Sequence, residues 1–530
     1  MTNSRSLLWL RALLIVAAGC WVFSPVFRGD WLMDDDLYLT QNALLNDPAR
    51  WWKIWFQPGS LIEYYPIEAT LQAIQWKLWG TETLGYHLTN LALHLVAAFL
   101  VWRLLGKFGL RYAWLGGLLF VIHPVVVESV AWIAEFKNVL SLPPFLLAMC
   151  AWINYEEKGQ KRDYLLALGF FLIAMLCKIS MALFPLILLL YAWWKRGRLG
   201  IGDIKATTPF LLISLVLGVT TICVGSWFRE AHLMPMGAYP IGGIPSRLAL
   251  AGLSLSAYFQ HFLWPVGLLP IYAKWSINPP SPGQFVPWAI LLGMVYWCWK
   301  ERTSWGRHVL LGLGFFVINL LPFIGLNSVS YMTFTWIMDH FLYLPMIGLI
   351  GLAIAGMEKI EGGHLFFQKP LGASILAAVM TLLLLESHTY AGMYVSQETL
   401  WTYTLTRNPD AWLARNNLGN VYLAEGRTAE AIYQYQRVLE LRPFTTQAHN
   451  NLGVALEQLQ RPAEAIPYFQ AALKLNPNFA MAQVNLANAL SQLGRKEEAV
   501  AHYEEALRID PHYTEARTNL DKLRAEMDKR

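Results

Sequence analysis

The feature that most constrains this chain is a succession of long apolar runs. A helix needs about 20 mostly apolar residues to cross a bilayer. Within a bilayer, only helices and closed barrels can pair all their backbone polar groups. Nine runs are interpreted as membrane spans: residues 7–27, 84–105, 113–130, 139–155, 208–228, 285–299, 309–326, 341–357 and 371–390. Two shorter runs, 164–177 and 181–194, flank Lys178 and bring the predicted spans to eleven.

The composition agrees with a membrane protein. Hydrophobic residues make up 55% of the chain and charged residues 15%, whereas a soluble globular chain carries about 25% charged residues. The net charge of +5 is small, and no basic stripe follows the C-terminal repeats, so the sequence does not predict nucleic-acid binding. The five cysteines all lie inside apolar runs without metal-ligand spacing and are interpreted as core residues.

The orientation of the spans follows from the basic residues in short loops, which favour the cytosolic side. Arg5 and Arg11 place the N-terminus in the cytosol. The remaining basic loops are all cytosolic only if residues 248–269 do not cross the membrane. The C-terminal arm then lies outside the cytosol, and it changes sides if 248–269 does cross. The predicted outer segments are the long stretch 28–83, the turn 123–137, the turn at Lys178, and 327–340.

The C-terminal quarter repeats itself every 34 residues. Pro409, Pro443, Pro477 and Pro511 mark the period, which is that of the tetratricopeptide repeat (TPR), a helix pair that stacks into a solenoid. The predicted elements are a half repeat at 396–409, repeats at 410–443, 444–477 and 478–511, and a capping helix at 512–528. We therefore predict an all-α chain, with a polytopic transmembrane bundle at 1–395 and a TPR α-solenoid at 396–530.

Asparagines recur at the same period within the repeats, at Asn417, Asn451, Asn485 and Asn519. A ladder of amides along a TPR groove can donate to and accept from an extended peptide backbone. The alternative is that asparagine at this position only caps or solvates the repeat surface. The first interpretation predicts a peptide groove formed by these four residues.

Three adjacent carboxylates, Asp34, Asp35 and Asp36, open the long outer segment. Neighbouring carboxylates repel one another, which raises at least one pKa. Such a group can act as a general base for a hydroxyl acceptor, or it can be a solvated acidic loop. The sequence commits to no cofactor, and a divalent cation such as magnesium or manganese at the acidic segment is an alternative that it leaves open.

Further polar side chains occur where chemistry at a membrane face could use them. His87, Asn90 and His94 share one face of the second span, where polar groups are either functional or bonded between helices. The third span ends at His123 and Glu128, followed by Glu135 and Lys137. Lys178 between two apolar runs could hold a lipid phosphate as a point charge, or it could only extend to the interface.

These residues stand in a series of motifs that carries a resemblance. In order they are LMDDDLYL, YYPI, GYHLTNLALH, HPVVVESVAW, residues 178–185, LWPVGLLPIY, LPFIGL, DHFLYLPMIGL and SQETLWTYTLTRNPD. The chain resembles the transmembrane-and-TPR O-mannosyltransferases and their bacterial relatives, which are members of the C-type glycosyltransferase superfamily. The likeness runs in the same order along nearly the whole chain, which is more specific than any single motif.

The resemblance implies transfer of a mannose-like sugar from a polyprenyl-phosphate carrier to a Ser or Thr hydroxyl at the outer face of a bacterial inner membrane or its equivalent. Asp34 and Asp35 match the family's catalytic acidic pair. Lys178, Lys137 and His123 are the candidates for the donor phosphate. The candidates for acceptor binding or support are Asp36, Tyr64, Tyr65, His87, Glu128, Glu135, Asp339 and His340. Expected partners are the lipid-linked sugar, membrane lipids and a protein or peptide acceptor held by the TPR groove.

The chain also departs from the family pattern. Relatives tend to have Glu-Arg-Lys-Asp where this chain has residues 135–138, Lys-Pro where it has residues 178–179, and Asp-Arg-Tyr where it has residues 339–341. Two arginines, the usual bidentate phosphate ligands, are therefore missing. A non-catalytic TPR membrane scaffold is the alternative function, and transfer to a lipid-linked glycan is a further one.

Overall fold

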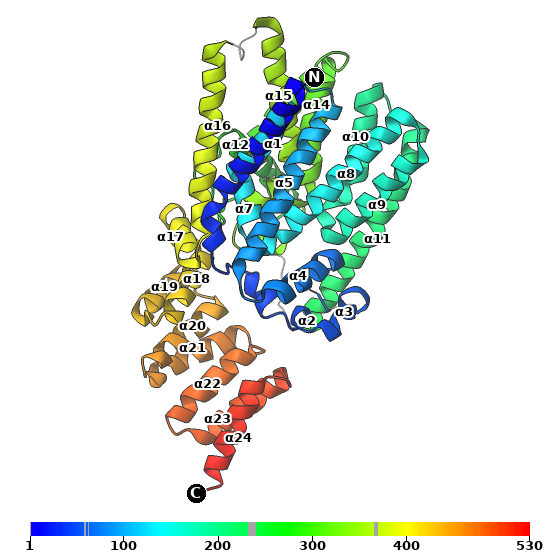
Figure 1. Cartoon of the computed structure of the whole chain (residues 1–530). Helices are drawn as coiled ribbons and strands as arrows, with labels where there is room; N and C mark the ends of the chain where they lie inside the picture. Colours follow the sequence, from blue (N-terminus) through cyan, green and yellow to red (C-terminus); the bar gives the residue numbers. More distant parts are fainter. Residues whose placement is uncertain (1, 58–59, 62, 232–239, 365–368, 530) are drawn as a thin grey trace. The chain divides into compact units, whose positions relative to one another are not determined.

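The computed structural model describes residues 2–57, 60–61, 63–231, 240–364 and 369–529, so positions 58, 59 and 62 of the predicted outer segment lie outside the described residues. The chain divides into two compact units, Met1–Ser396 and Gln397–Arg530. Every regular element in the described residues is helical, which confirms the all-α prediction. Figure 1 shows the order of the helices within each unit.

The first unit contains helices for all eleven predicted spans. They are α1 (Thr2–Val22), α5 (Thr83–Lys107), α6 (Ala113–Ile122) with α7 (Val127–Ala131), α8 (Phe136–Lys158), α9 (Lys161–Cys177), α10 (Phe184–Arg196), α11 (Ile201–Ala231), α13 (Val286–Lys300), α14 (Gly306–Leu320), α15 (Met346–His364) and α16 (Pro370–Ala391). Within the described residues, seven helices are long and apolar enough to cross a membrane, or eight if the bent pair α6–α7 counts as one span. The chain is thus a multi-pass membrane protein.

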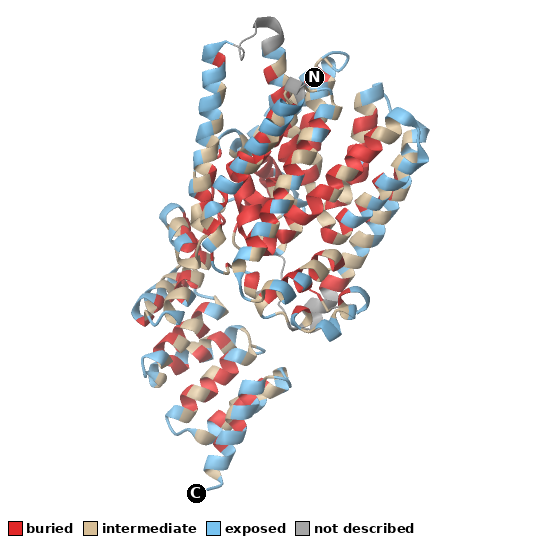
Figure 2. Ribbon diagram, in the orientation of Figure 1, coloured by how far each residue is buried: buried red, intermediate tan, exposed pale blue. Residues whose placement is uncertain are grey.

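Burial separates central helices from peripheral ones. In the apolar window around α8, 83% of the residues are buried, against 22% around α11 and 11% around α16. Figure 2 shows the same contrast, with buried residues concentrated in α5, α7 and α8 and exposed ones along α11 and α16. The exposed residues of α11 and α16 are mostly apolar, as expected for helices that face lipid.

Two predicted segments differ in detail from the structure. The run 113–130 is broken, because the short turn Pro124–Val126 separates α6 from α7 and the two helices meet at 56°. Pro124 lacks a backbone N–H and disfavours a helical conformation in the residue before it, and His123 is accordingly extended. Residues 248–269 contain the helix α12 (Ile244–Leu263). α12 is not among the helices that qualify as spans, and its failure to cross stays a prediction.

The long outer segment folds into short helices, where the sequence predicted a loop. They are α2 (Ala43–Asn46), α3 (Trp52–Phe56) and α4 (Pro66–Trp79). A small apolar core holds them together, formed by Leu39, Leu45, Ile54, Leu61, Ala69, Ala73, Tyr86 and Ile133. Because Tyr86 belongs to α5 and Ile133 follows α7, this core fixes the outer segment to the bundle.

The second unit is a stack of helix pairs. It comprises α17 (Gln397–Arg407), α18 (Trp412–Ala424), α19 (Thr428–Leu441), α20 (Thr446–Gln458), α21 (Pro462–Leu475), α22 (Ala480–Gln492), α23 (Lys496–Ile509) and α24 (Thr514–Met527). The recurring small residues allow each pair to close: a Cβ on Gly453 would lie 2.5 Å from the Phe469 ring, and one on Gly419 would lie 2.6 Å from the Tyr435 ring. Neighbouring pairs share one continuous apolar core, as a solenoid requires.

Candidate functional site

Asp35 is a fully buried carboxylate that joins two distant parts of the first unit. Its Oδ2 accepts a hydrogen bond of 2.8 Å from the backbone N–H of Leu32, and its Oδ1 accepts one of 2.7 Å from the backbone N–H of Ala134. Burial raises the pKa of Asp35 to about 8, although both hydrogen bonds act in the opposite direction. With both oxygens occupied by the backbone, Asp35 fixes the position of the acidic segment.

Asp34, by contrast, has an exposed side chain. The protein surrounding it raises the pKa of Asp34 above its ordinary value, with Lys137 acting to lower it and Glu135 to raise it further. An accessible carboxylate with a raised pKa is a better proton acceptor than a solvated one. Of the two predicted catalytic residues, Asp34 is therefore the one placed to meet a substrate.

The third acidic residue has a local role. Asp36 begins a single turn of π-helix, Asp36–Thr40, and its Oδ1 accepts a hydrogen bond of 2.6 Å from the Thr40 hydroxyl. The three aspartates thus do not converge on one point. Across the part of the chain that the structure describes, no group of three His, Cys, Asp or Glu side chains is placed to hold a metal ion.

Lys137 lies beside this acidic segment and acts on the charge of Asp34. Its Nζ lies 4.9 Å from the centroid of the Tyr38 ring, 3.4 Å from Oε2 of Glu63 and 3.9 Å from Oε1 of Glu135. Tyr38 and Glu63 belong to the outer segment, whereas Lys137 and Glu135 stand at the start of α8. Together with the Asp35–Ala134 hydrogen bond, these contacts hold the acidic segment against the first turn of α8.

Lys178 joins the same cluster from the turn between α9 and α10. Its buried ammonium group donates a hydrogen bond to the side-chain carbonyl of Asn138 and lies 4.0 Å from Oε2 of Glu135. The amide group of Asn138 in turn donates to Glu135. An aspartate at 138, which the family pattern favours, could not make that donation. The asparagine here therefore connects the lysine to the glutamate.

His340, far along the chain, also contacts the cluster. Its ring Nδ1 and its backbone N–H lie 3.0 and 3.1 Å from the two carboxylate oxygens of Glu128, and its Nε2 lies 3.9 Å from Oε1 of Glu135. A cavity of about 20 Å³, room for about one water molecule, adjoins these groups. Its lining comprises Asn138, Lys178, Ser180, Met181, Asn319, Phe323, His340, Phe341, Tyr343, Leu344 and Pro345.

Several predicted site residues have other contacts. Nε2 of His123 lies 3.0 Å from the Phe262 carbonyl, and its Nδ1 accepts from the Val125 N–H, so neither nitrogen is free for a phosphate. Asp339 accepts from the Tyr272 hydroxyl at 2.9 Å and lies 3.0 Å from His261. These residues brace the turn 264–272 and the segments around it. Among the described residues, none of these hydrogen bonds joins His123 or Asp339 to Lys137 or Lys178.

The remaining three predicted residues differ from one another. The hydroxyl of Tyr64 donates to the Trp55 carbonyl at 3.2 Å, within the outer segment. The hydroxyl of Tyr65 lies 3.4 Å from Oε1 of Glu63, which places it beside the Lys137 ion pair. His87 is buried in α5 with no hydrogen-bond partner for either ring nitrogen. Of these three, Tyr65 thus adjoins the charged cluster through a hydrogen bond.

In the second unit, three of the four ladder asparagines donate to other asparagines of the preceding repeat. Nδ2 of Asn451 donates to Oδ1 of Asn420 at 3.0 Å, and Nδ2 of Asn485 donates to Oδ1 of Asn450 at 2.9 Å. Nδ2 of Asn519 donates to Oδ1 of Asn488 at 3.1 Å. The ladder thus connects successive repeats, a role that the sequence interpretation did not consider. Its use as a peptide groove stays a prediction.

Sequence reasoning missed Glu63, which pairs with Lys137, and Asn319, which lines the small cavity. It also missed Glu68, Gln72 and Gln75 of α4, which are buried although polar. The signal for the last three was available in their spacing, because positions i, i+4 and i+7 share one face of a helix.

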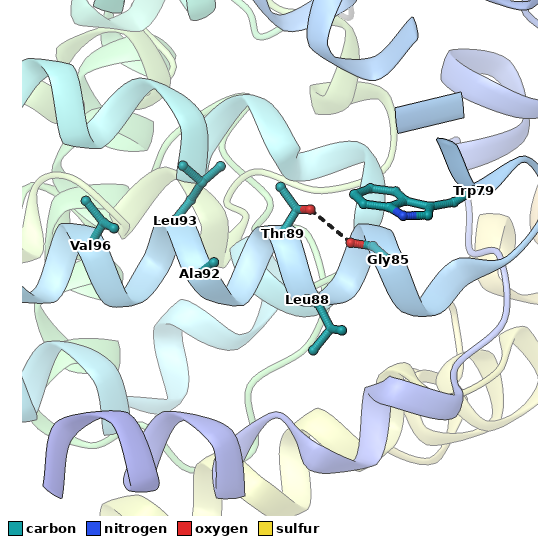
Figure 3. Close-up of a pocket in the computed structure, with 7 residues that line it drawn as sticks. All are labelled: Trp79, Gly85, Leu88, Thr89, Ala92, Leu93 and Val96. Atoms are coloured by element: carbon teal, nitrogen blue, oxygen red, sulfur yellow. Dashed lines mark hydrogen bonds between the residues drawn. The ribbon is translucent and has the colours of Figure 1, made fainter. Parts of the chain in front are cut away.

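A larger hollow lies on the face of α5. It measures about 400 Å³ and is lined by Trp79, Gly85, Leu88, Thr89, Ala92, Leu93 and Val96. Figure 3 shows the Trp79 ring beside Gly85, with the Thr89 hydroxyl bonded to the Gly85 carbonyl at 2.9 Å. This hollow contains no titratable side chain, so it is not where the chemistry of the acidic segment takes place.

Comparison with known proteins relates these features to a family. Residues 65–227 match the family model described as dolichyl-phosphate-mannose-protein mannosyltransferase. Residues 408–460 and 450–514 match models of the TPR repeat. Protein O-mannosyl-transferase TMTC4 of Mus musculus is 24% identical over 487 residues, covering 78% of this chain and 64% of that protein. These matches support a relationship to the transmembrane-and-TPR O-mannosyltransferase family.

Other members of the family show similar likeness. Protein O-mannosyl-transferase Tmtc3 of Drosophila melanogaster is 22% identical, covering 76% of this chain and 50% of that protein. Protein O-mannosyl-transferase TMTC1 of Homo sapiens is 24% identical, covering 82% of this chain and 55% of that protein. The chain therefore spans between half and two thirds of the length of these relatives. This relationship agrees with the resemblance seen in the motifs.

Proposed function

We propose that the protein is a membrane glycosyltransferase that moves a mannose-like sugar from a polyprenyl-phosphate carrier to a Ser or Thr hydroxyl of a protein. The observation that carries the proposal is the arrangement of Asp34. This accessible carboxylate is held by Asp35 beside the cluster of Lys137, Glu135 and Lys178. A base for the acceptor thus lies next to cations suited to a departing phosphate.

The reaction requires little of the protein beyond positioning. Asp34 accepts the proton of the acceptor hydroxyl, and the hydroxyl oxygen forms a bond to C1 of the sugar with inversion. The bond from C1 to the phosphate oxygen breaks, and the polyprenyl phosphate leaves with the electron pair. Lys178 and Lys137 stabilise the negative charge that develops on that phosphate, and the phosphate is already a good leaving group.

The residues that line the small cavity match the chemical groups of a polyprenyl-phosphate donor. Lys178, Asn138 and Asn319 supply polar groups on one side, and Phe323 and Phe341 supply stacked aromatic rings whose centroids are 4.0 Å apart. A phosphate requires the polar groups, and an isoprenoid chain requires an apolar wall. Because the cavity holds about one water molecule as it stands, Ser180 and the aromatic rings have to move apart to admit a phosphate.

The acceptor is a protein or peptide held by the TPR unit. We place this unit and the acidic segment on the same, extracytoplasmic side of a bacterial inner membrane or its equivalent. The distribution of basic loops supports this orientation. In that arrangement the acceptor is delivered to the side of the membrane on which Asp34 works.

The test is transfer by the purified full-length protein in lipid nanodiscs, with polyprenyl-phosphate mannose and a Ser/Thr-rich peptide as substrates. Asp34→Asn is expected to lower the rate about 10²–10⁴-fold, the range for loss of a general base. The matched control is Asp30→Asn, an exposed aspartate of the same segment, which should keep the wild-type rate. An unchanged rate in Asp34→Asn would overturn the mechanism, and a wild-type protein that transfers no sugar would favour the scaffold.

A further inference from the structure

The helix α4 of the outer segment buries three polar side chains beside its small apolar residues, while larger apolar residues of the same helix are exposed. Gln72 and Gln75 are only 2% and 6% exposed, and Glu68 is 5% exposed. On the other side of the same helix, Ile74 is 40% and Leu78 is 67% exposed. A surface helix of a soluble protein buries its apolar face. In a membrane protein, polar side chains instead face the interior or a binding cavity.

Each of these three buried side chains has one polar atom that meets no hydrogen-bond partner in the part of the chain that the structure describes. The atoms are Oε1 of Glu68, Nε2 of Gln72 and Nε2 of Gln75. Each such atom destabilises the fold when nothing meets it, because burial removes its hydrogen bonds to water. Native proteins keep few of them, usually at functional places or where a ligand or water completes the bond. Three such atoms on one face of one helix indicate a binding surface for a ligand that forms hydrogen bonds.

This surface adjoins the candidate active site. α4 packs against α9, whose last residue precedes Lys178, and against α8, which carries Lys137 in its first turn. The charges of Lys137, Glu63, Glu135 and Lys178 all act on the carboxyl group of Glu68. The polar face of α4 therefore begins at the charged cluster and continues away from it along the helix.

The chemistry of the face selects a class of ligand. Two unpartnered amide groups offer hydrogen-bond donors, and the carboxyl of Glu68 offers a further hydrogen-bonding oxygen. Burial raises the pKa of Glu68 to about 8, so at neutral pH this group mostly keeps its proton and carries no charge. An uncharged set of donors and acceptors suits a neutral polyol, whose hydroxyls both donate and accept, better than it suits a phosphate.

We propose that Glu68, Gln72 and Gln75 of α4 form the subsite that holds the hydroxyl groups of the transferred sugar. This assignment rests on the proposed function, because it takes the ligand to be the sugar of a lipid-linked donor. The phosphate then lies at the lysines and the sugar along α4, with C1 between them and near Asp34. The apolar outer face of α4, with Ile74 and Leu78, faces lipid.

The test separates sugar recognition from phosphate recognition. Binding of polyprenyl-phosphate mannose and of bare polyprenyl phosphate is measured on the full-length protein in nanodiscs without an acceptor. The variants are Gln72→Met and Gln75→Met, which keep side-chain length and remove the amide. Each should weaken binding of the mannosyl lipid about tenfold, the equivalent of one lost hydrogen bond to a ligand, and leave binding of the bare lipid unchanged.

Stability provides the second readout. Replacing an unpartnered buried amide with an apolar group should leave Tm of the free protein unchanged or raise it, whereas loss of a purely structural bond would lower it. Gln41→Met, an exposed glutamine of the same segment, is the matched control for both readouts. Variants that keep the wild-type preference for the mannosyl lipid, or a wild-type protein without any preference, would overturn the assignment. A wild-type protein that prefers the mannosyl lipid over the bare lipid but transfers no sugar would contradict the proposed function and leave the sugar subsite standing.

Discussion

The carboxylate of Asp35 accepts a 2.7 Å hydrogen bond from the backbone N–H of Ala134, which joins two positions 99 residues apart. Its other oxygen accepts from the N–H of Leu32. The acidic segment is therefore held at the start of α8 by a carboxylate that has no oxygen left for a substrate. Asp34 next to it keeps its side chain accessible, so the two residues of the acidic pair have different tasks.

This division predicts different effects for the same substitution. Asp35→Asn directs an amide N–H₂ at one of the two backbone N–H groups, so one acceptor is lost. We expect a loss of about 1–3 kcal/mol in stability, seen as a lower Tm in nanodiscs, together with a lower transfer rate. Asp34→Asn should lower the rate at an unchanged Tm. Equal Tm values for Asp35→Asn and the wild type would show that the hydrogen bonds from Leu32 and Ala134 to Asp35 do not stabilise the fold.

The pH dependence of transfer follows from the surroundings of Asp34. The surrounding protein, which reduces hydration of the carboxyl group, and Glu135 raise its pKa above the ordinary value of 3.8, and Lys137 lowers it. Because the ionised form is the base, the rate should rise with pH through this raised pKa. Glu135→Gln removes a negative charge, lowers the pKa of Asp34 and moves the rise to lower pH, whereas Lys137→Met moves it to higher pH. Shifts of both variants in one direction would contradict Asp34 as the base.

The raised pKa of Glu68 predicts that the stability of the protein depends on pH. Burial raises this pKa from 4.5 to about 8, so the folded state favours the protonated form. The stability from this group is complete below pH 4.5 and is lost as the pH rises through 8. Gln resembles the protonated carboxyl, so Glu68→Gln should match the wild-type Tm at pH 4 and exceed it at pH 9. A variant less stable than the wild type at pH 9 would show that the ionised form has a partner.

The sequence predicted the all-α fold and the repeat unit because both depend on local patterns, namely apolar length and a 34-residue period. It did not predict that Asp35 fixes the segment while Asp34 stays accessible, since this difference depends on the hydrogen bond from the distant N–H of Ala134. It also did not indicate that both nitrogens of His123 are occupied. Burial of Gln72 and Gln75 could have been suspected from their helical spacing. Their lack of partners appears only once the neighbouring helices are in place.

The position of α4 depends on a glycine in α5. A Cβ on Gly85 would lie 2.2 Å from the ring of Trp79, the last residue of α4. Gly85→Ala therefore has to displace the indole ring, and we expect a loss of about 1–3 kcal/mol, as for overpacking. The matched control is Gly169→Ala in α9, where a Cβ meets nothing within 4 Å. Thermal unfolding of both variants in nanodiscs measures the difference.

The same displacement should reach the sugar subsite. If α4 moves in Gly85→Ala, its polar face moves too, and preference for the mannosyl lipid over the bare lipid should fall. Trp79→Ala added to Gly85→Ala removes the clash, so the double variant should lose less stability than the sum of the two single variants. Additive losses would show that the ring and the glycine are not in conflict.

The asparagine ladder leads to a last prediction, about the TPR unit. Nδ2 of Asn485 donates to the buried Asn450 at 2.9 Å, which connects α22 to α20. Asn485→Ala leaves the Asn450 carbonyl without this donor, and we expect a loss of about 1 kcal/mol in local stability. Hydrogen exchange of the full-length protein should show faster exchange in α20 and α22, whereas Asn478→Ala, at an exposed asparagine, should change nothing. Unchanged exchange in Asn485→Ala combined with weaker peptide binding would instead favour the ladder as a peptide groove, because the amides would then serve the ligand and not the stack.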